Sequence, residues 1–137
     1  MKKIAYLLLL LVSLVTLRAD DVDAIQGKWT VKKTGDQGPF TQRLEIKKNK
    51  FFFKIIGEGN KTMLYAEGEV ELKKQGPFNT IRFFKIRAGG SETELDDVDE
   101  ERNAVYILDN GLFNLATNFD RARDNEKPSL DAYSKEK

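Results

Sequence analysis

The stretch that decides the fold is Leu64-Tyr65-Ala66-Glu67-Gly68-Glu69-Val70-Glu71-Leu72. Its even positions carry apolar or small residues, and three of its odd positions carry glutamate. Successive side chains of a strand point to opposite faces of a sheet, so a period of two separates a buried face from a solvated one. The stretch therefore predicts a half-buried strand of an antiparallel sheet, with its three glutamates on the outer, solvated face.

Similar patterns recur along the chain, each bounded by Gly, Pro, Asn or Asp. The last two predicted strands flank Asp109-Asn110-Gly111, and Asn-Gly accepts the positive φ angles of a tight hairpin turn. Parallel strands need crossovers of a dozen or more residues, and no convincing helix separates these strands. The pattern predicts an all-β fold, either a small antiparallel up-and-down barrel or a β-sandwich. The predicted strands are residues 28–33, 43–47, 51–56, 64–72, 81–86, 104–108 and 112–117.

Two stretches depart from this regularity. The adjacent Phe83 and Phe84 predict a bulge, or burial of that strand on both sides. Residues 89–102 are predicted to form a long exposed loop, with an acidic run from Asp96 to Glu101. Carboxylates are suitable ligands for Ca²⁺, but this run lacks the central Gly and the distant Glu of a calcium loop. We therefore expect a solvated loop and no metal site.

The N-terminus has the three parts of a secretion signal. Lys2 and Lys3 precede an uncharged, almost wholly apolar run at residues 4–17, and Ala19 is a small residue suited to cleavage. A permanent membrane helix needs about 20 apolar residues, which is more than this run supplies. We predict a signal peptide at residues 1–19, cleaved near Ala19, and a periplasmic or secreted protein without membrane attachment after cleavage. The domain is expected at residues 20–130, followed by a polar tail at residues 131–137.

Composition limits both chemistry and partners. Without residues 1–19 the chain has 20 basic and 22 acidic residues, a formal charge of −2, which gives no field that attracts nucleic acid. The chain has no Cys and no His. That excludes disulfides, Ser-His-Asp and Cys-His nucleophiles, and the usual zinc and haem ligands. We predict a protein without enzymatic activity and without a cofactor.

Gly27-Lys28-Trp29, at the start of the first predicted strand, has the Gly-x-Trp form of lipocalins and fatty-acid-binding-like barrels. Together with residues 25–31, the paired strands around Asn49-Lys50 and residues 105–115, it makes the chain resemble a small lipocalin-like domain family of secreted planctomycete-type bacterial proteins. The resemblance implies a lipocalin-like barrel and a secreted location, and the family has no established activity. The chain departs from the family at Lys127-Pro128, where Arg-Pro is commoner, and at Ala116, where Cys is frequent.

In such barrels the Trp closes one end, which is the position that the resemblance implies for Trp29. A late basic residue packs on this Trp in true lipocalins. Arg121 and Arg123 are therefore the candidates for that contact in this chain.

The aromatic side chains of the predicted strands are the candidate site. If they line an apolar interior cavity, the domain binds a small lipophilic or amphipathic ligand. If they fill the interior, as side chains commonly do in small barrels, the domain is a structural or interaction module that engages another exported protein. A carboxylate-dependent hydrolase is the third alternative, and it requires two acidic side chains in one cleft. The candidate residues are Trp29, Phe51, Phe53, Phe83, Tyr106 and Phe113.

Overall fold

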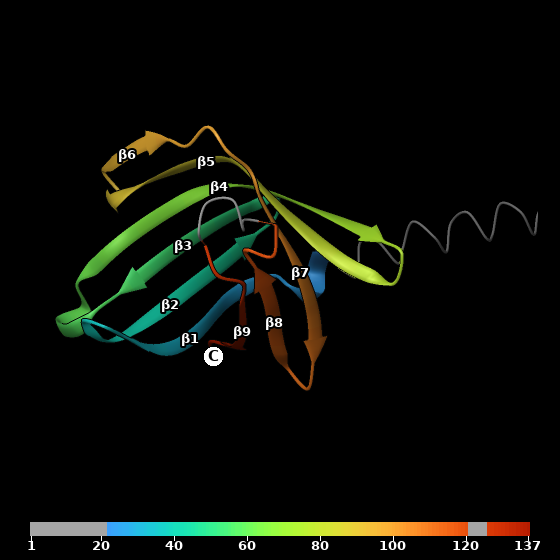
Figure 1. The fold of residues 1–137 in the computed structure, drawn as a ribbon, viewed down its shortest axis with the longest axis horizontal. Coiled ribbons are helices and arrows are strands. Elements are labelled where there is room, and N and C mark those ends of the chain that lie inside the picture. The colour runs from blue at the N-terminus through green and yellow to red at the C-terminus, as the bar shows by residue number, and fades with distance from the viewer. Residues whose placement is uncertain (1–21, 121–125) are drawn as a thin grey trace, which may run out of the picture.

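Strands account for most of the chain in the computed structural model, which describes residues 22–120 and 126–137 (Figure 1). A short 3-10 turn at Glu58–Asn60 lies between two of them. The strands are β1 (Gly27–Gly35), β2 (Gly38–Lys47), β3 (Lys50–Ile56), β4 (Thr62–Gln75), β5 (Phe78–Ser91), β6 (Glu94–Asp97), β7 (Arg102–Asp109), β8 (Leu112–Thr117) and β9 (Ser129–Lys135).

Eight of these strands close into an antiparallel barrel. The neighbours run in the order β4-β3-β2-β1-β9-β8-β7-β5, and β5 pairs again with β4. Barrel strands that follow one another in the sequence are therefore neighbours in the barrel. β6 is not part of the barrel and pairs with the second half of β5. This arrangement confirms the predicted all-β, up-and-down barrel, and the alternative of a β-sandwich is wrong.

The alternation in β4 has the predicted consequence. Ala66 and Val70 are buried, whereas the three glutamates point outward. Each glutamate forms an ion pair with a basic residue of the neighbouring strand β5 at 2.9–3.6 Å. The outer face of this hairpin is thus a ladder of opposite charges, and no two of these carboxylates enter the interior. The pairs are Glu67 with Arg87, Glu69 with Lys85, and Glu71 with Arg82.

A bulge interrupts the pairing of β4 with β5 at Gly68. Glu67 faces Arg87 and Glu69 faces Phe84, so two residues of β5 stand opposite one glycine. A Cβ atom on Gly68 would lie 2.7 Å from the carbonyl oxygen of Phe84, which is closer than such atoms approach. The bulge lies beside the predicted Phe83-Phe84 pair, and Phe83 is buried while Phe84 lies outside.

Two predicted boundaries are wrong. Residues 89–102 are not one loop, because Glu94–Asp97 form β6 against β5. The polar tail expected at residues 131–137 is largely part of the barrel, because β9 runs to Lys135 and the Glu136 N–H donates to the Lys28 carbonyl at 2.8 Å. Both segments were missed because few of their side chains are apolar.

The predicted signal peptide at residues 1–19 lies outside the described residues. In the part of the chain that is described, there is no helix with the length and apolar character needed to cross a membrane.

Adjacent glycines at the junction of β5 and β6 offer a matched test of the backbone. A Cβ on Gly89 would lie 1.7 Å from the carbonyl oxygen of Glu94, whereas a Cβ on Gly90 meets nothing within 4 Å. We expect Gly89→Ala to lower the free energy of unfolding by about 1–3 kcal/mol, because β6 must move away from β5. Gly90→Ala should change it by less than about 1 kcal/mol, with either sign. Urea unfolding followed by circular dichroism measures both, and equal effects would contradict this account of the junction.

Candidate functional site

One end of the barrel is filled by aromatic rings. Phe113 is fully buried, and its ring centroid lies 5.3 Å from that of Trp29, 5.5 Å from Tyr106 and 6.4 Å from Tyr133. The indole N–H of Trp29 donates to the Ile25 carbonyl at 2.8 Å, so the one polar atom of this ring is satisfied. We call Trp29, Tyr106, Phe113 and Tyr133 the aromatic plug.

A cation does pack on Trp29, but it comes from the last strand. The ammonium group of Lys135 lies 5.4 Å from the centre of the indole ring, within the range of a cation–π contact. Arg121 and Arg123, the candidates for this contact, lie outside the described residues.

The other end of the barrel contains a cavity of about 640 Å³. Residues near the end of β1 and near the starts of β4, β7 and β9 line it. These residues are Lys33, Leu64, Arg102 and Ser129. Its walls are mainly apolar, and its opening is ringed by polar side chains. The apolar lining consists of Leu44, Phe51, Phe53, Ile55, Leu64, Ala66, Phe83, Ile86, Ala88, Val98, Ala104 and Leu115.

The six candidate aromatic residues divide between these two regions. Phe51, Phe53 and Phe83 line the cavity, and the rings of Phe51 and Phe83 meet edge to face at 5.0 Å. The other three, Trp29, Tyr106 and Phe113, belong to the plug and do not line the cavity. Sequence reasoning also missed the aliphatic part of the lining, although the period-two pattern marks Leu64 and Ala66 as inward residues.

Arg102 organises one side of the opening. Its guanidinium group contacts Glu126 at 2.6 and 3.2 Å, Glu100 at 3.3 Å and the side-chain oxygen of Asn118 at 3.4 Å. Arg102 therefore ties the start of β7 to residues on both sides of the connection between β8 and β9. Bidentate pairing with a carboxylate is a favoured geometry for arginine.

Two side-chain contacts cross the opening from β1 and β2 to β9. Lys33 Nζ lies 2.8 Å from Asp131 Oδ1, and the Tyr133 hydroxyl donates to Gln42 Oε1 at 3.0 Å. Burial raises the pKa of Tyr133 above its ordinary value of 10, and the nearby charge of Asp131 raises it further. Tyr133 thus remains neutral at physiological pH.

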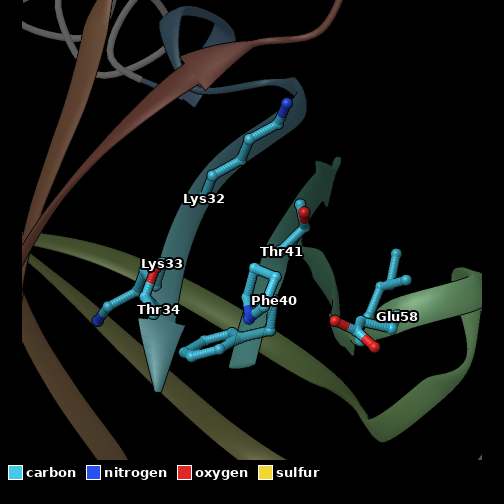
Figure 2. A pocket seen from close by; sticks show the side chains of 9 residues that line it. Lys32, Lys33, Thr34, Phe40, Thr41 and Glu58 are labelled. Carbon is cyan, nitrogen blue, oxygen red and sulfur yellow. The ribbon is translucent and has the colours of Figure 1, made fainter. Parts of the chain in front are cut away.

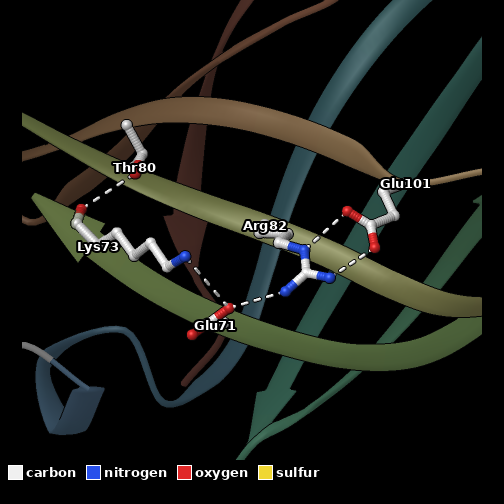
Figure 3. A network of polar contacts seen from close by, with 5 residues as sticks. All are labelled: Glu71, Lys73, Thr80, Arg82 and Glu101. Carbon is white, nitrogen blue, oxygen red and sulfur yellow. Dashed lines mark hydrogen bonds and ion pairs between the residues drawn. The ribbon is translucent and has the colours of Figure 1, made fainter. Parts of the chain in front are cut away.

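An ion-pair network on the outer surface fixes the segment that leads into β7 (Figure 3). Arg82 lies between Glu71, at 2.9 Å, and Glu101, at 2.8 Å, and its guanidinium group lies 4.4 Å from the centre of the Phe84 ring. The hydrogen bonds from Arg82 lower the pKa of Glu101. Since the Val98 N–H also donates to the Ile86 carbonyl at 2.8 Å, this segment is held against β5 beside the cavity.

A second hollow, of about 420 Å³, lies outside the barrel beside the β1–β2 hairpin and the 3-10 turn (Figure 2). Phe40 is its single aromatic residue, and none of its nine lining residues is buried. Such a shallow surface groove offers little area for a ligand to bury. The interior cavity is therefore the candidate functional site.

The acidic run does not converge. Asp97 pairs with Arg87 at 3.5 Å, Glu101 with Arg82, and Glu100 with Arg102. Among the described residues no three acidic side chains gather closely enough to hold a metal ion.

Comparison with known proteins adds no relative. No family model matches the chain, and neither a curated protein nor a solved structure matches it. The likeness to the small lipocalin-like family therefore stays a prediction that rests on Gly27-Lys28-Trp29 and the other matching stretches.

The two buried tyrosines predict a loss of stability at alkaline pH. Burial and a hydrogen bond with Glu67 raise the pKa of Tyr65 to about 12, and Tyr133 shifts in the same direction. A group whose pKa is raised in the folded state contributes stability that is complete below its unfolded pKa of about 10 and is lost as pH rises towards the folded value. We expect each tyrosine to remove about 1.4 kcal/mol per pH unit across this window. Urea unfolding at pH 8 and pH 11 should show a smaller loss for Tyr133→Phe than for the unmodified protein, and an equal loss would contradict the assignment.

Proposed function

We propose that this barrel binds a small apolar or amphipathic molecule in its interior cavity. The observation that carries the proposal is the cavity of about 640 Å³, a volume within the range of small-molecule sites. Its lining of mainly aliphatic and aromatic side chains, with polar groups only around the opening, is also typical of such sites. The apolar walls fit the body of the ligand, and the opening fits a polar end.

The physical argument for a ligand concerns exposed apolar surface. Part of the apolar wall faces water when no ligand is bound, because Leu64 is 37% exposed and Phe53 is partly exposed, whereas deeper wall residues such as Phe51 are buried. Removing apolar surface from water is favourable by about 25 cal/mol per Å². A lipophile that fills the cavity gains this contribution from its own surface and from the wall.

The proposed function includes no chemical step, cofactor or nucleic acid. In support, the chain has no His and no Cys. The row formed by Glu67, Glu69 and Glu71 lies on the outer face, where each carboxylate faces a cation.

A second candidate function is supported by the outer face of β7, β8 and β9, which is poor in charges. One row across it is Val105, Ala116 and Leu130, and the exposed fraction of Leu130 is 74%. Ile107, which is 60% exposed, lies in the next row. An exposed apolar face of this kind fits an interaction module that engages another exported protein.

We also propose that the domain acts outside the cytoplasm, in the periplasm or as a secreted protein. The support is the pattern of Lys2, Lys3, the apolar run at residues 4–17 and Ala19. Expression of the full chain in a bacterium should yield an exported product whose intact mass lacks residues 1–19, or a few residues more or fewer. A product that keeps its N-terminus and stays in the cytoplasm would contradict export.

Filling the cavity tests the proposed function. Ala88 lines the cavity, whereas Ala132 is exposed on the outer face of β9. We expect the unmodified protein to bind N-phenyl-1-naphthylamine, a neutral lipophile whose fluorescence rises in apolar surroundings, with saturation at one probe per chain. Ala88→Trp should weaken binding by at least about tenfold, because the indole occupies the space of the ligand. Ala132→Trp is the matched control and should bind as the unmodified protein does.

Circular dichroism and urea unfolding establish that each variant is folded. Absence of saturable binding by the unmodified protein would overturn the proposal and leave the interaction module as the better candidate. Equal binding by Ala88→Trp and Ala132→Trp would show that the probe binds elsewhere.

A further inference from the structure

The junction between β1 and β9 is the shortest in the barrel. Backbone pairing joins Trp29 to Lys135 and Thr30 to Ser134, and then ends. All other neighbouring barrel strands share at least five residue pairs. Both strands nevertheless continue, β1 to residue 35 and β9 back to residue 129. Five residues of each strand therefore run past the end of the ladder.

Side chains bridge the gap that the backbone leaves. The Lys33–Asp131 ion pair and the Tyr133–Gln42 hydrogen bond cross it, and all four residues line the cavity. Figure 2 shows the Lys33 side chain leaving β1 on the side away from Glu58. We call Lys33, Gln42, Asp131 and Tyr133 the latch.

The two strands are held firmly beyond the other end of the gap. Trp29 packs on Phe113 of β8, Lys135 packs over Trp29, and Glu136 N–H donates to the Lys28 carbonyl. A strand pair that is fixed at one end and unpaired at the other opens by swinging about its fixed end. Opening would widen the gap most where it meets the cavity.

We propose that the gap between β1 and β9 is the route by which a ligand enters and leaves the cavity, and that the latch holds this route closed. The inference rests on the proposed binding function. Among the described residues, opening here breaks one ion pair, one hydrogen bond and no backbone pairing, whereas separating any other two neighbouring barrel strands breaks at least five backbone residue pairs. Ion pairs between partly exposed groups contribute little to stability, and Lys33 remains 31% exposed.

The rest of the opening is less free to widen. At the start of β7, Arg102 contacts Asn118 and Glu126 through several hydrogen bonds at once. Next to it, the network of Arg82 and Glu101 holds the segment before β7 against β5. The β1–β9 side is thus the side that yields first.

A cross-link tests the route, and the absence of native Cys makes it specific. In the double variant Lys33→Cys, Asp131→Cys, a short bis-maleimide bridges the two strands. The matched control is the same double variant with both thiols capped by N-ethylmaleimide, which modifies the same positions without joining them. We expect the bridged form to bind N-phenyl-1-naphthylamine with an association rate and a dissociation rate at least about tenfold slower than those of the capped form, measured by stopped-flow fluorescence.

A single substitution tests the latch without a cross-link. Asp131→Asn removes the ion pair, and we expect the association rate of the probe to rise by about threefold. Glu69→Gln removes a comparable ion pair, Glu69–Lys85, on the outer face and should leave that rate unchanged. The comparison of these two single variants still tests the route if the double cysteine variant does not fold.

The outcomes separate the two proposals. Saturable binding with equal rates in the bridged and capped forms, or in Asp131→Asn and Glu69→Gln, would overturn the route and leave the binding function standing. Absence of saturable binding by the unmodified protein would overturn both.

Discussion

The contact between Trp29 and Phe113 is the interaction on which closure of this barrel depends. It joins the first strand of the chain to β8, and Tyr133 of β9 packs on the same phenyl ring. Backbone pairing between β1 and β9 spans two residue pairs, and a net hydrogen bond contributes only about 1 kcal/mol. Burial of a large aromatic side chain contributes about 1.5–3 kcal/mol, and a ring contact adds about 0.5–1.5 kcal/mol more. The first and last strands are therefore held together chiefly by side-chain packing.

The sizes of the inward side chains explain why one end of the barrel is filled and the other contains a cavity. The plug contains three aromatic residues around Phe113. The cavity wall instead contains Ala66, Ala88 and Ala104 at inward positions, where a small side chain leaves space. The bulge at Gly68 brings the backbone of β5 close to β4 near the ring of Phe51, which lines the cavity. The cavity is thus a consequence of where small residues occur in the inward rows.

The sequence predicted most of the barrel because period-two alternation marks a strand that is buried on one face. It predicted all the strands from β1 to β5, and also β7 and β8; the predicted bounds of β8 match the observed ones, whereas those of the other strands are too short. β9 was not predicted, because its inward residues Ser129, Asp131 and Tyr133 are mostly polar and the strand lacks the alternation of apolar and polar side chains. The six candidate aromatic residues were predicted to lie in the barrel interior, and all of them belong to the buried core or pack against it. Only three of them line the cavity. Which end an inward residue faces depends on the stagger of its neighbours, and local sequence does not encode that.

The polar inward residues of β9, which prevented its prediction from the sequence, also make its junction with β1 unusual. A regular barrel would place apolar side chains at residues 33 and 131, and these would extend the core and seal the gap. Instead Lys33 and Asp131 form an ion pair that is partly open to water. Such a pair adds little stability, whereas buried apolar side chains would add more. Departures from a consistent pattern are expected where function competes with stability. A gap bridged by one ion pair and one hydrogen bond has the property that an apolar seal lacks: it closes this side of the cavity and still separates at low cost.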